Sequence, residues 1–393
     1  METIVVLGAD QSTIRAALLL RRIKQRARIL VFPWSFQTPC IIQPLVPFYL
    51  KGDVEEDTLV LYTNEMLRDA LRIQVMKPVE DIDLDERVVE TNDQVQGFDR
   101  MLISLNEEIL ALVGGKTLSL SHLRDLKTMR CILEQSKEVS LTGSMPIVLD
   151  VASAVKVPLT LYPRDIERYL DKEILEKLEE YTSRVGIYLH GERKGVQIVL
   201  KEHINRVINK ILEHLGDSTY EDLLGSSIVA YGSLVPALNA VTQMKYKFKE
   251  WPTIDNMARM AALSLSSHRP ILRGFLKYYW WRLRNLFIYT MGLTEAEALS
   301  IYDNITSTRV RLENRSFEVI VKAIAERRER RILGIQAISF GIRLDNIFSL
   351  LLPIRMRVPL DSIVPVYIPD AHTPFRDAIN IMIEALWRKL FRI

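Results

Sequence analysis

The chain has 393 residues, a length that suits two or three domains with ample hydrophobic core. Its 52 basic and 49 acidic residues leave a formal net charge of +3, which argues against nucleic-acid binding by bulk electrostatics. Its two cysteines and six histidines show no disulfide or metal-ligand spacing, so we expect no metal site. The start METIVVLG has no charged leader, and no apolar stretch is long enough to span a bilayer. We therefore expect a cytoplasmic protein without membrane insertion.

The chain opens with the pattern of a strand, a tight turn and a helix. Four apolar residues, Ile4–Leu7, lead into Gly8, and apolar positions then recur at helical spacing as far as Arg22. A second apolar run, Ile29–Phe32, follows at the distance that a right-handed β-α-β unit requires. This order is typical of a dinucleotide-binding fold.

The turn after the first strand departs from the usual phosphate-binding pattern. That pattern is G-x-G-x-x-G, in which the middle glycine lets the pyrophosphate approach the backbone and the last lets helix and strand pack closely. The three positions hold Gly8, Asp10 and Thr13. Asp10 suits a helix N-cap, but its charge opposes a phosphate. Pro33 stands where an acidic residue would bind the adenosine ribose.

The pattern of strand, turn and helix is repeated later in the chain. The repeat begins in Glu138–Val155, and its second strand is expected in Val157–Asp165. Its glycine positions hold Gly143, Met145 and Val148. The two larger side chains would place hydrocarbon where a phosphate would bind.

Two further positions depart in the same way. Tyr162 follows the second strand of the repeat, where an acidic residue is expected. A third strand, in Ser226–Leu238, carries Gly232 followed by Ser233, whereas folds of this kind have an aspartate after the glycine.

Several longer segments resemble one known family. They are PLVPFYLKGDV (Pro44–Val54), FDRMLISLN (Phe98–Asn106), GLTEAEA (Gly292–Ala298), RRILGIQAISFG (Arg330–Gly341) and VYIPDAHTPFRDAINIMIEAL (Val366–Leu386). Together with the order of elements, they resemble the pyridine nucleotide-disulfide oxidoreductases, and within that family the coenzyme A-disulfide reductase and NADH oxidase branch. The likeness covers nearly the whole chain, with a shortened second domain.

The resemblance implies an α/β fold with two interleaved Rossmann-like domains and a C-terminal α+β dimerisation domain. The FAD-binding-like domain would span residues 1–118 and 217–268, the NAD(P)-binding-like domain 119–216, and the dimerisation domain 269–393. The resemblance also implies a dimer. We expect a homodimer or a heteromer with a paralogue, and no nucleic-acid partner.

The same resemblance suggests a few site residues. Cys40 lies near the position of the family's redox thiol, although the alignment to Pro47 requires inserted residues, and an inert loop cysteine is the alternative. Tyr367 falls where the reductases place an aromatic residue near the partner subunit's thiol, and a tyrosine of a dimer interface is the alternative. Gly8, Gly143 and Gly232 are interpreted as remnants of the nucleotide motifs.

The pattern of losses leads to a functional hypothesis. Both glycine motifs, both ribose carboxylates and the flavin-side aspartate are absent together, while the segments that define the scaffold remain. We therefore expect a non-catalytic structural or regulatory interaction protein with no bound cofactor. The alternative is an active flavin-dependent NAD(P)H oxidoreductase that binds FAD and NAD(P)H through unusual contacts. The basic aromatic segment KYYWWRLR (Lys277–Arg284) could contact nucleic acid, but a half-buried strand explains it more simply.

Overall fold

The chain folds as two compact units, each assembled from separate segments. The computed structural model describes residues 1–35, 40–268, 273–313, 315, 317–366, 368 and 378–391. Unit 1 comprises Met1–Ser136, Val199–Leu238 and Lys245–Leu272, and unit 2 comprises Lys137–Ile198, Asn239–Met244 and Arg273–Ile393. The chain therefore passes between the units repeatedly, once within strand β15 (Val196–His203).

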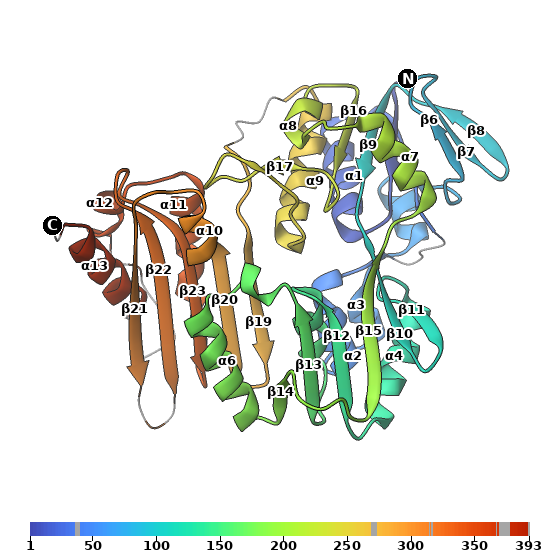
Figure 1. The fold of residues 1–393 in the computed structure, drawn as a ribbon. Coiled ribbons are helices and arrows are strands. Elements are labelled where there is room, and N and C mark those ends of the chain that lie inside the picture. Colours follow the sequence, from blue (N-terminus) through green and yellow to red (C-terminus); the bar gives the residue numbers. More distant parts are fainter. Residues whose placement is uncertain are drawn as a thin grey trace. The chain divides into compact units, whose positions relative to one another are not determined.

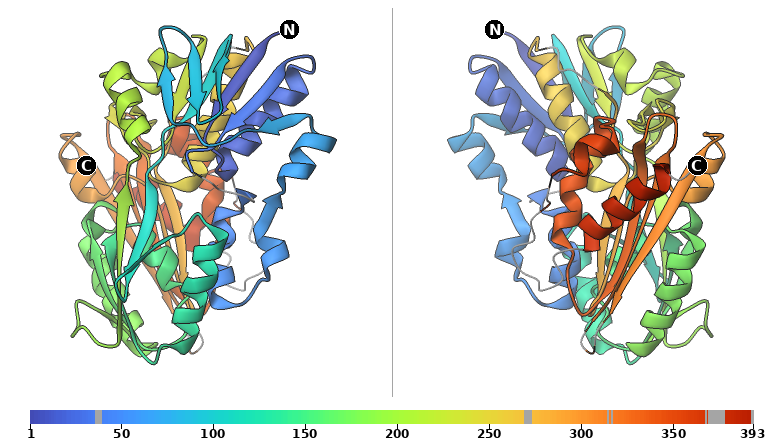
Figure 2. Two further views of the ribbon diagram at one scale, coloured as in Figure 1. Left: turned by 90° about the vertical axis from the view of Figure 1, so that its right-hand side faces the viewer. Right: turned by 90° about the vertical axis from the view of Figure 1, so that its left-hand side faces the viewer.

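Unit 1 is built on a parallel sheet with the strand order β16-β9-β1-β2-β5, of which β9 and β16 are labelled in Figure 1. These strands are β1 (Thr3–Leu7), β2 (Arg28–Phe32), β5 (Ile73–Val75), β9 (Arg100–Ser104) and β16 (Ile228–Tyr231). The apolar side chains of β1, β2 and β9 are buried, as expected of parallel strands covered on both faces. Helix α1 (Gln11–Ile23) joins β1 to β2 as the sequence predicts, and it packs beside α9 (Trp251–Leu265) (Figure 2).

The remaining elements of unit 1 are mostly short. Strands β6, β7 and β8 form an antiparallel sheet, and β10 pairs with β11. The elements are β3 (Cys40–Ile41), η1 (Gln43–Leu45), α2 (Val46–Lys51), α3 (Glu56–Leu59), β4 (Val60–Tyr62), the π-helical turn η2 (Met66–Ala70), β6 (Asp81–Asp83), β7 (Val88–Thr91), β8 (Gln94–Gly97), β10 (Glu108–Val113), β11 (Lys116–Ser119), α4 (Leu123–Gln135), α7 (Arg206–Leu215), α8 (Tyr220–Leu223), β17 (Ala237–Leu238) and β18 (Lys245–Tyr246).

Unit 2 contains the repeated pattern of strand, turn and helix. Strand β13 lies between β12 and β14 and pairs in parallel with both. The elements are β12 (Val139–Ser144), α5 (Ile147–Ala152), β13 (Leu159–Arg164), η3 (Ile166–Arg168), α6 (Lys172–Arg184) and β14 (Ile187–Leu189). The helix after the turn is only 6 residues long here, compared with 13 in α1.

The C-terminal part of unit 2 is an antiparallel sheet with the order β19-β20-β23-β22-β21 (Figure 1). The strands are β19 (Tyr278–Leu283), β20 (Leu286–Gly292), β21 (Ile305–Glu313), β22 (Glu318–Glu326) and β23 (Arg331–Phe340), and the helices are α10 (Glu295–Leu299), η4 (Asp345–Leu350), α11 (Leu351–Arg355), α12 (Leu360–Ile363) and α13 (Ala378–Phe391). Helix α13 packs on β21 and β22 (Figure 2). The basic aromatic segment forms β19, with Trp281 buried and Arg282 exposed, so its interpretation as a half-buried strand agrees with the structure.

The α/β class predicted from the sequence is confirmed, since both units contain parallel β-α-β structure. The C-terminal sheet with its helices has an α+β arrangement, and its role in dimerisation stays a prediction. The proposed division into three domains also stays a prediction. Among the described residues, no helix is both long enough and apolar enough to cross a membrane.

Candidate functional site

The turn after β1 lies at the carboxyl end of the unit 1 sheet, where dinucleotide-binding folds hold their ligand. Gly8 has φ of 107°, a conformation that favours glycine, and its N–H donates to the carbonyl of Phe32 at 2.8 Å. A Cβ atom added to Gly8 would lie 2.9 Å from Ser104 Cβ and 3.1 Å from Thr13 Oγ1. The backbone of a phosphate-binding turn is therefore retained, but the chain's own side chains fill the space beside Gly8.

Asp10 caps α1 and is the centre of a polar cluster. Its carboxylate accepts a hydrogen bond from Thr13 N at 2.9 Å, as an N-cap residue does. It also accepts from Ser12 Oγ at 2.5 Å, from Ser104 Oγ at 2.7 Å and from Asn106 Nδ2 at 3.2 Å. The carboxylate thus satisfies donors from both the helix and the end of β9.

Tyr231 closes this cluster from β16. Its side chain is fully buried, and its hydroxyl lies 2.9 Å from Thr13 Oγ1 and 3.3 Å from Ser12 Oγ. Burial, followed by the charge of Asp10, raises the pKa of Tyr231 well above its usual value. The phenol is therefore neutral and acts as a hydrogen-bonding support for the start of α1.

Gly232 and Ser233, at the end of β16, are bound to the end of β9. Gly232 has φ of 128°, and an added Cβ would lie 2.6 Å from Asn106 Oδ1. Ser233 N donates to that same oxygen at 2.8 Å, and Glu107 N donates to Ser233 Oγ at 3.1 Å. Ser233 thus takes part in a connection between the ends of two strands.

Pro33 directly follows β2, at the position where a carboxylate is expected, and Trp34 comes next. The Nε1 of Trp34 donates to the carbonyl of Ser104 at 2.9 Å. An added Cβ on Gly8 would lie 3.4 Å from this Nε1. The indole therefore stands beside the turn after β1, and neither Pro33 nor Trp34 offers an acceptor for ribose hydroxyls in its side chain.

These contacts test whether the turn fits the phosphates of FAD. The N-terminus of a helix attracts an anion, and at α1 the carboxylate of Asp10 already occupies that position. Ser104, Thr13 and Trp34 fill the approach to Gly8. The turn consequently does not fit a diphosphate placed as in the G-x-G-x-x-G arrangement.

Cys40, the proposed redox thiol, begins the short strand β3 of unit 1. Its side chain is 8% exposed and forms no disulfide. Burial, then the charge of Asp10, raises the pKa of the Cys40 thiol to about 12, and Arg15 opposes this shift. The thiol is thus protonated near neutral pH in this conformation, whereas a redox thiolate requires a lowered pKa. Tyr367, the other proposed site residue, lies outside the described residues.

In unit 2, Gly143 lies near the end of β12 and pairs with Pro163 of β13. The side chains of Met145 and Val148, at the two remaining motif positions, are 1% and 0% exposed. Tyr162 of β13 lies under the guanidinium of Arg193, whose Cζ is 4.9 Å from the ring centroid. An aromatic ring and a cation therefore stand near the end of β13, where an acidic residue is usual.

A titratable pair in unit 2 was not predicted from the sequence. The Tyr279 hydroxyl donates to Asp150 Oδ2 at 2.5 Å, and its ring stacks on Trp281 with centroids 4.5 Å apart. Burial raises the pKa of Asp150 to about 7, and the Tyr279 hydrogen bond opposes this shift. A single aspartate in the apolar segment IVLDVA was the available signal, but nothing local indicated Tyr279, which lies 129 residues away.

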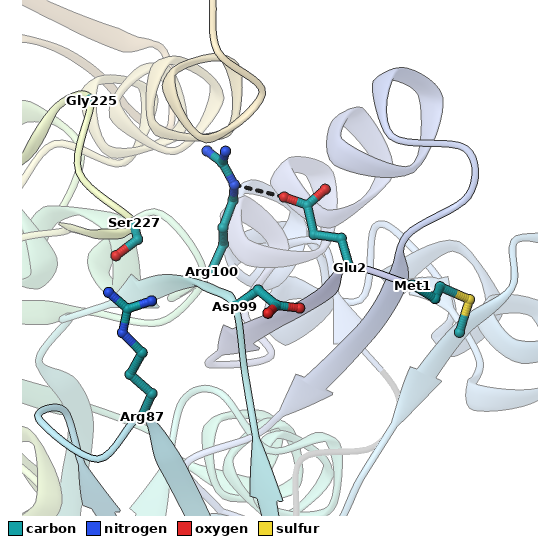
Figure 3. Close-up of a pocket in the computed structure, with 7 residues that line it drawn as sticks. All are labelled: Met1, Glu2, Arg87, Asp99, Arg100, Gly225 and Ser227. Atoms are coloured by element: carbon teal, nitrogen blue, oxygen red, sulfur yellow. Dashed lines mark hydrogen bonds and ion pairs between the residues drawn. The ribbon is translucent and has the colours of Figure 1, made fainter.

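A polar pocket of about 640 Å³ lies at the opposite edge of the unit 1 sheet, at the amino ends of β1, β9 and β16 (Figure 3). Its lining residues are Met1, Glu2, Arg87, Asp99, Arg100, Gly225 and Ser227. Arg100 donates to Glu2 at 2.7 Å and to the carbonyl of Leu265 at 2.8 Å, while Asp99 accepts from Thr3 N at 2.7 Å. Arg100, Glu2 and Asp99 of the pocket therefore already have partners within the chain.

Comparisons with known proteins identify the fold. No family model matches the chain. A solved NAD-dependent persulfide reductase from A. fulgidus superposes with a TM-score of 0.82 at 17% identity, covering 98% of this chain and 83% of that one. A water-forming NADH oxidase from Lactobacillus brevis, bound to NADH, gives 0.80 at 15% identity and covers 99% of both chains. The chain has the fold of the pyridine nucleotide-disulfide oxidoreductases.

One curated protein, also an NADH oxidase, matches the chain in sequence. The NADH oxidase of Methanocaldococcus jannaschii is 19% identical over an alignment of 230 residues, and the match covers 52% of this chain. The chain spans about half the length of this oxidase, since the match covers 48% of it. The family resemblance predicted from the sequence is thus confirmed at the level of the pyridine nucleotide-disulfide oxidoreductase fold.

These relatives correct the functional expectation. The expectation of a non-catalytic interaction protein was wrong, because the structures and the curated protein that resemble this chain are a reductase and oxidases. The expectation of no bound cofactor was wrong for the same reason, since one neighbour is NAD-dependent and another is bound to NADH. Gly8 and Gly232 keep positive φ values although the other motif glycines are replaced, so the replaced residues alone do not show that the activity is lost.

Proposed function

We propose that the chain is an active flavin-dependent NAD(P)H oxidoreductase of the NADH oxidase or disulfide reductase kind. The observation that carries this proposal is the likeness of nearly the entire chain to an NAD-dependent reductase and an NADH oxidase. The structural matches cover 98–99% of this chain. This likeness of fold supports a shared activity more strongly than the replaced glycines and carboxylates oppose it. FAD and NAD(P)H are the cofactors that the proposal requires.

The first test is the visible absorption spectrum of the purified native protein. We expect oxidised-flavin bands, and a higher melting temperature when FAD is added, because a ligand that binds only the native state stabilises it. Consumption of NADH and NADPH is then followed with oxygen or a disulfide as acceptor. The assay includes both nucleotides because a carboxylate that binds the ribose hydroxyl is the usual sign of NAD preference, and Tyr162 and Arg193 supply none. A colourless protein that is unaffected by FAD and consumes neither nucleotide contradicts the proposal.

A variant of Cys40 distinguishes a disulfide from oxygen as the electron acceptor. If Cys40 is a redox thiol, the substitution Cys40→Ser abolishes disulfide reduction, and Cys131→Ala, which changes an exposed cysteine, leaves it intact. Unchanged turnover in Cys40→Ser leaves oxygen as the acceptor. Tyr367 is proposed as a second contributor, and Tyr367→Phe separates loss of its hydroxyl from loss of its ring.

We also propose that the protein assembles through its C-terminal sheet, as a homodimer or as a heteromer with a paralogue. Light scattering on the purified chain tests this, and a monomer at micromolar concentration contradicts the homodimer.

The two free cysteines suit a reducing compartment such as the cytoplasm.

A further inference from the structure

We propose that Asp10 takes the place of a cofactor phosphate at the start of α1, and that it makes this site select flavins by their phosphate content. This inference rests on the proposed flavin-dependent function. It follows from the disagreement between the retained fold and the residues at the turn after β1. Asp10 is thereby assigned as a specificity-determining residue.

The first step of the argument is the place of the carboxylate. The first N–H groups of a helix and its dipole attract one anionic group. At α1 the Asp10 carboxylate accepts from Thr13 N at 2.9 Å, so it already occupies the anion position. A phosphate brought to the same end would meet a like charge at short range in a partly buried setting, where screening is weak.

The second step is that the carboxylate is held in place. Ser12, Ser104 and Asn106 each donate a hydrogen bond to it, with distances of 2.5, 2.7 and 3.2 Å. Ser12 lies on α1, whereas the other two come from the end of β9. Rotation of Asp10 away from the turn would break these bonds, and leaving buried donors unsatisfied is costly. A phosphate therefore cannot displace Asp10 by a simple rotamer change.

The third step concerns positive charge near the turn. Arg15 lies on the first turns of α1, and its Nη1 is 3.3 Å from Asp255 Oδ2. Its guanidinium also lies over the ring of Trp251, with Cζ 5.4 Å from the centroid. Arg15 thus pairs with another carboxylate and stacks on an aromatic ring. Its positive charge therefore does not neutralise Asp10, and a phosphate at this position would still be repelled. A flavin bound to unit 1 must carry its phosphates away from the start of α1.

The test compares riboflavin, FMN and FAD, which carry zero, one and two phosphates, by flavin-fluorescence titration of the full chain. The test variant is Asp10→Asn, which keeps a side-chain oxygen for capping and removes the charge. The matched control is Asp99→Asn, because Asp99 accepts from Thr3 N at the opposite end of β1. Thermal melts check that each variant folds.

We expect the wild-type chain to bind FAD no more tightly than riboflavin. Asp10→Asn should raise the affinity for FAD at least about tenfold, while the affinity for riboflavin changes by less than about threefold. Asp99→Asn should leave the ratio of the two affinities unchanged. If flavins bind and the ratio is the same in all three proteins, the role of Asp10 is overturned and the proposed function stands. If no flavin binds to any of them, both proposals are overturned.

Discussion

Lys322 on β22 is a buried cation surrounded by carboxylates of unit 2. Its side chain is 3% exposed, and its Nζ lies 2.5 Å from Glu173, 2.7 Å from Glu295 and 3.2 Å from Asp171. Removing one partner of a buried ionic cluster leaves uncompensated charge. We predict that Lys322→Met lowers the free energy of unfolding by about 3–5 kcal/mol, measured by urea denaturation.

An exposed ion pair provides the matched control for Lys322. Lys210 and Asp81 are 2.7 Å apart and both more than half exposed. Lys210→Met should therefore cost no more than about 1 kcal/mol. Equal losses in the two variants would contradict the structural role given to Lys322.

Asp150 should make stability depend on pH. Burial raises its pKa from 3.8 to about 7, so the folded state binds the proton more tightly than the unfolded state does. The resulting stabilisation is fully present below about pH 4 and is lost as pH rises through about 7. We predict that the melting temperature of Asp150→Asn, relative to wild type, rises between pH 4 and pH 8.

The control for Asp150 is an exposed carboxylate with the opposite shift. The hydrogen bond from Lys210 lowers the pKa of Asp81, so Asp81→Asn should show no gain over the same interval. If the melting temperatures of wild type and Asp150→Asn change with pH in the same way, the raised pKa of Asp150 is refuted.

Strands β20 and β23 approach closely at a pair of glycines. Gly292 and Gly334 are register partners, and a Cβ on Gly334 would lie 2.8 Å from Leu293 N and 2.9 Å from Leu293 C. We predict that Gly334→Ala destabilises the protein by about 1–3 kcal/mol, because backbone atoms cannot give way as a side chain does. Gly97→Ala is the control, since its added Cβ would meet its nearest atom at 3.9 Å. Equal thermal stability of the two variants would argue against the close contact.

The elements with a strong local pattern were predictable from the sequence. Apolar runs and a capping aspartate sufficed for β1, α1 and β2. The polar cluster around Asp10 was not predictable. Its partners Ser104 and Asn106 lie 94 and 96 residues away, and only the sheet order brings the ends of β1 and β9 together.

For the whole chain, the interleaved segments predict how fragments behave. Residues 1–136 contain β1, β2, β5 and β9 but lack β16, which pairs with β9, and α9, which packs beside α1. A fragment ending at Ser136 would leave an unpaired strand edge and an uncovered helix face. We predict that it aggregates or unfolds without cooperativity in circular-dichroism melts. Cooperative unfolding of this fragment would show that β16 and α9 are dispensable.

The segmented sheet of unit 1 also has a consequence for synthesis on the ribosome. Strand β9 ends at Ser104, whereas its partner β16 begins only at Ile228. Synthesis proceeds at roughly 5–20 residues per second, so β16 is made on the order of ten seconds after β9. During that interval, β12 to β14 emerge and can begin to pair. The β9 edge that pairs with β16 in the folded sheet therefore stays unpaired in the nascent chain until residues 228–231 have been synthesised.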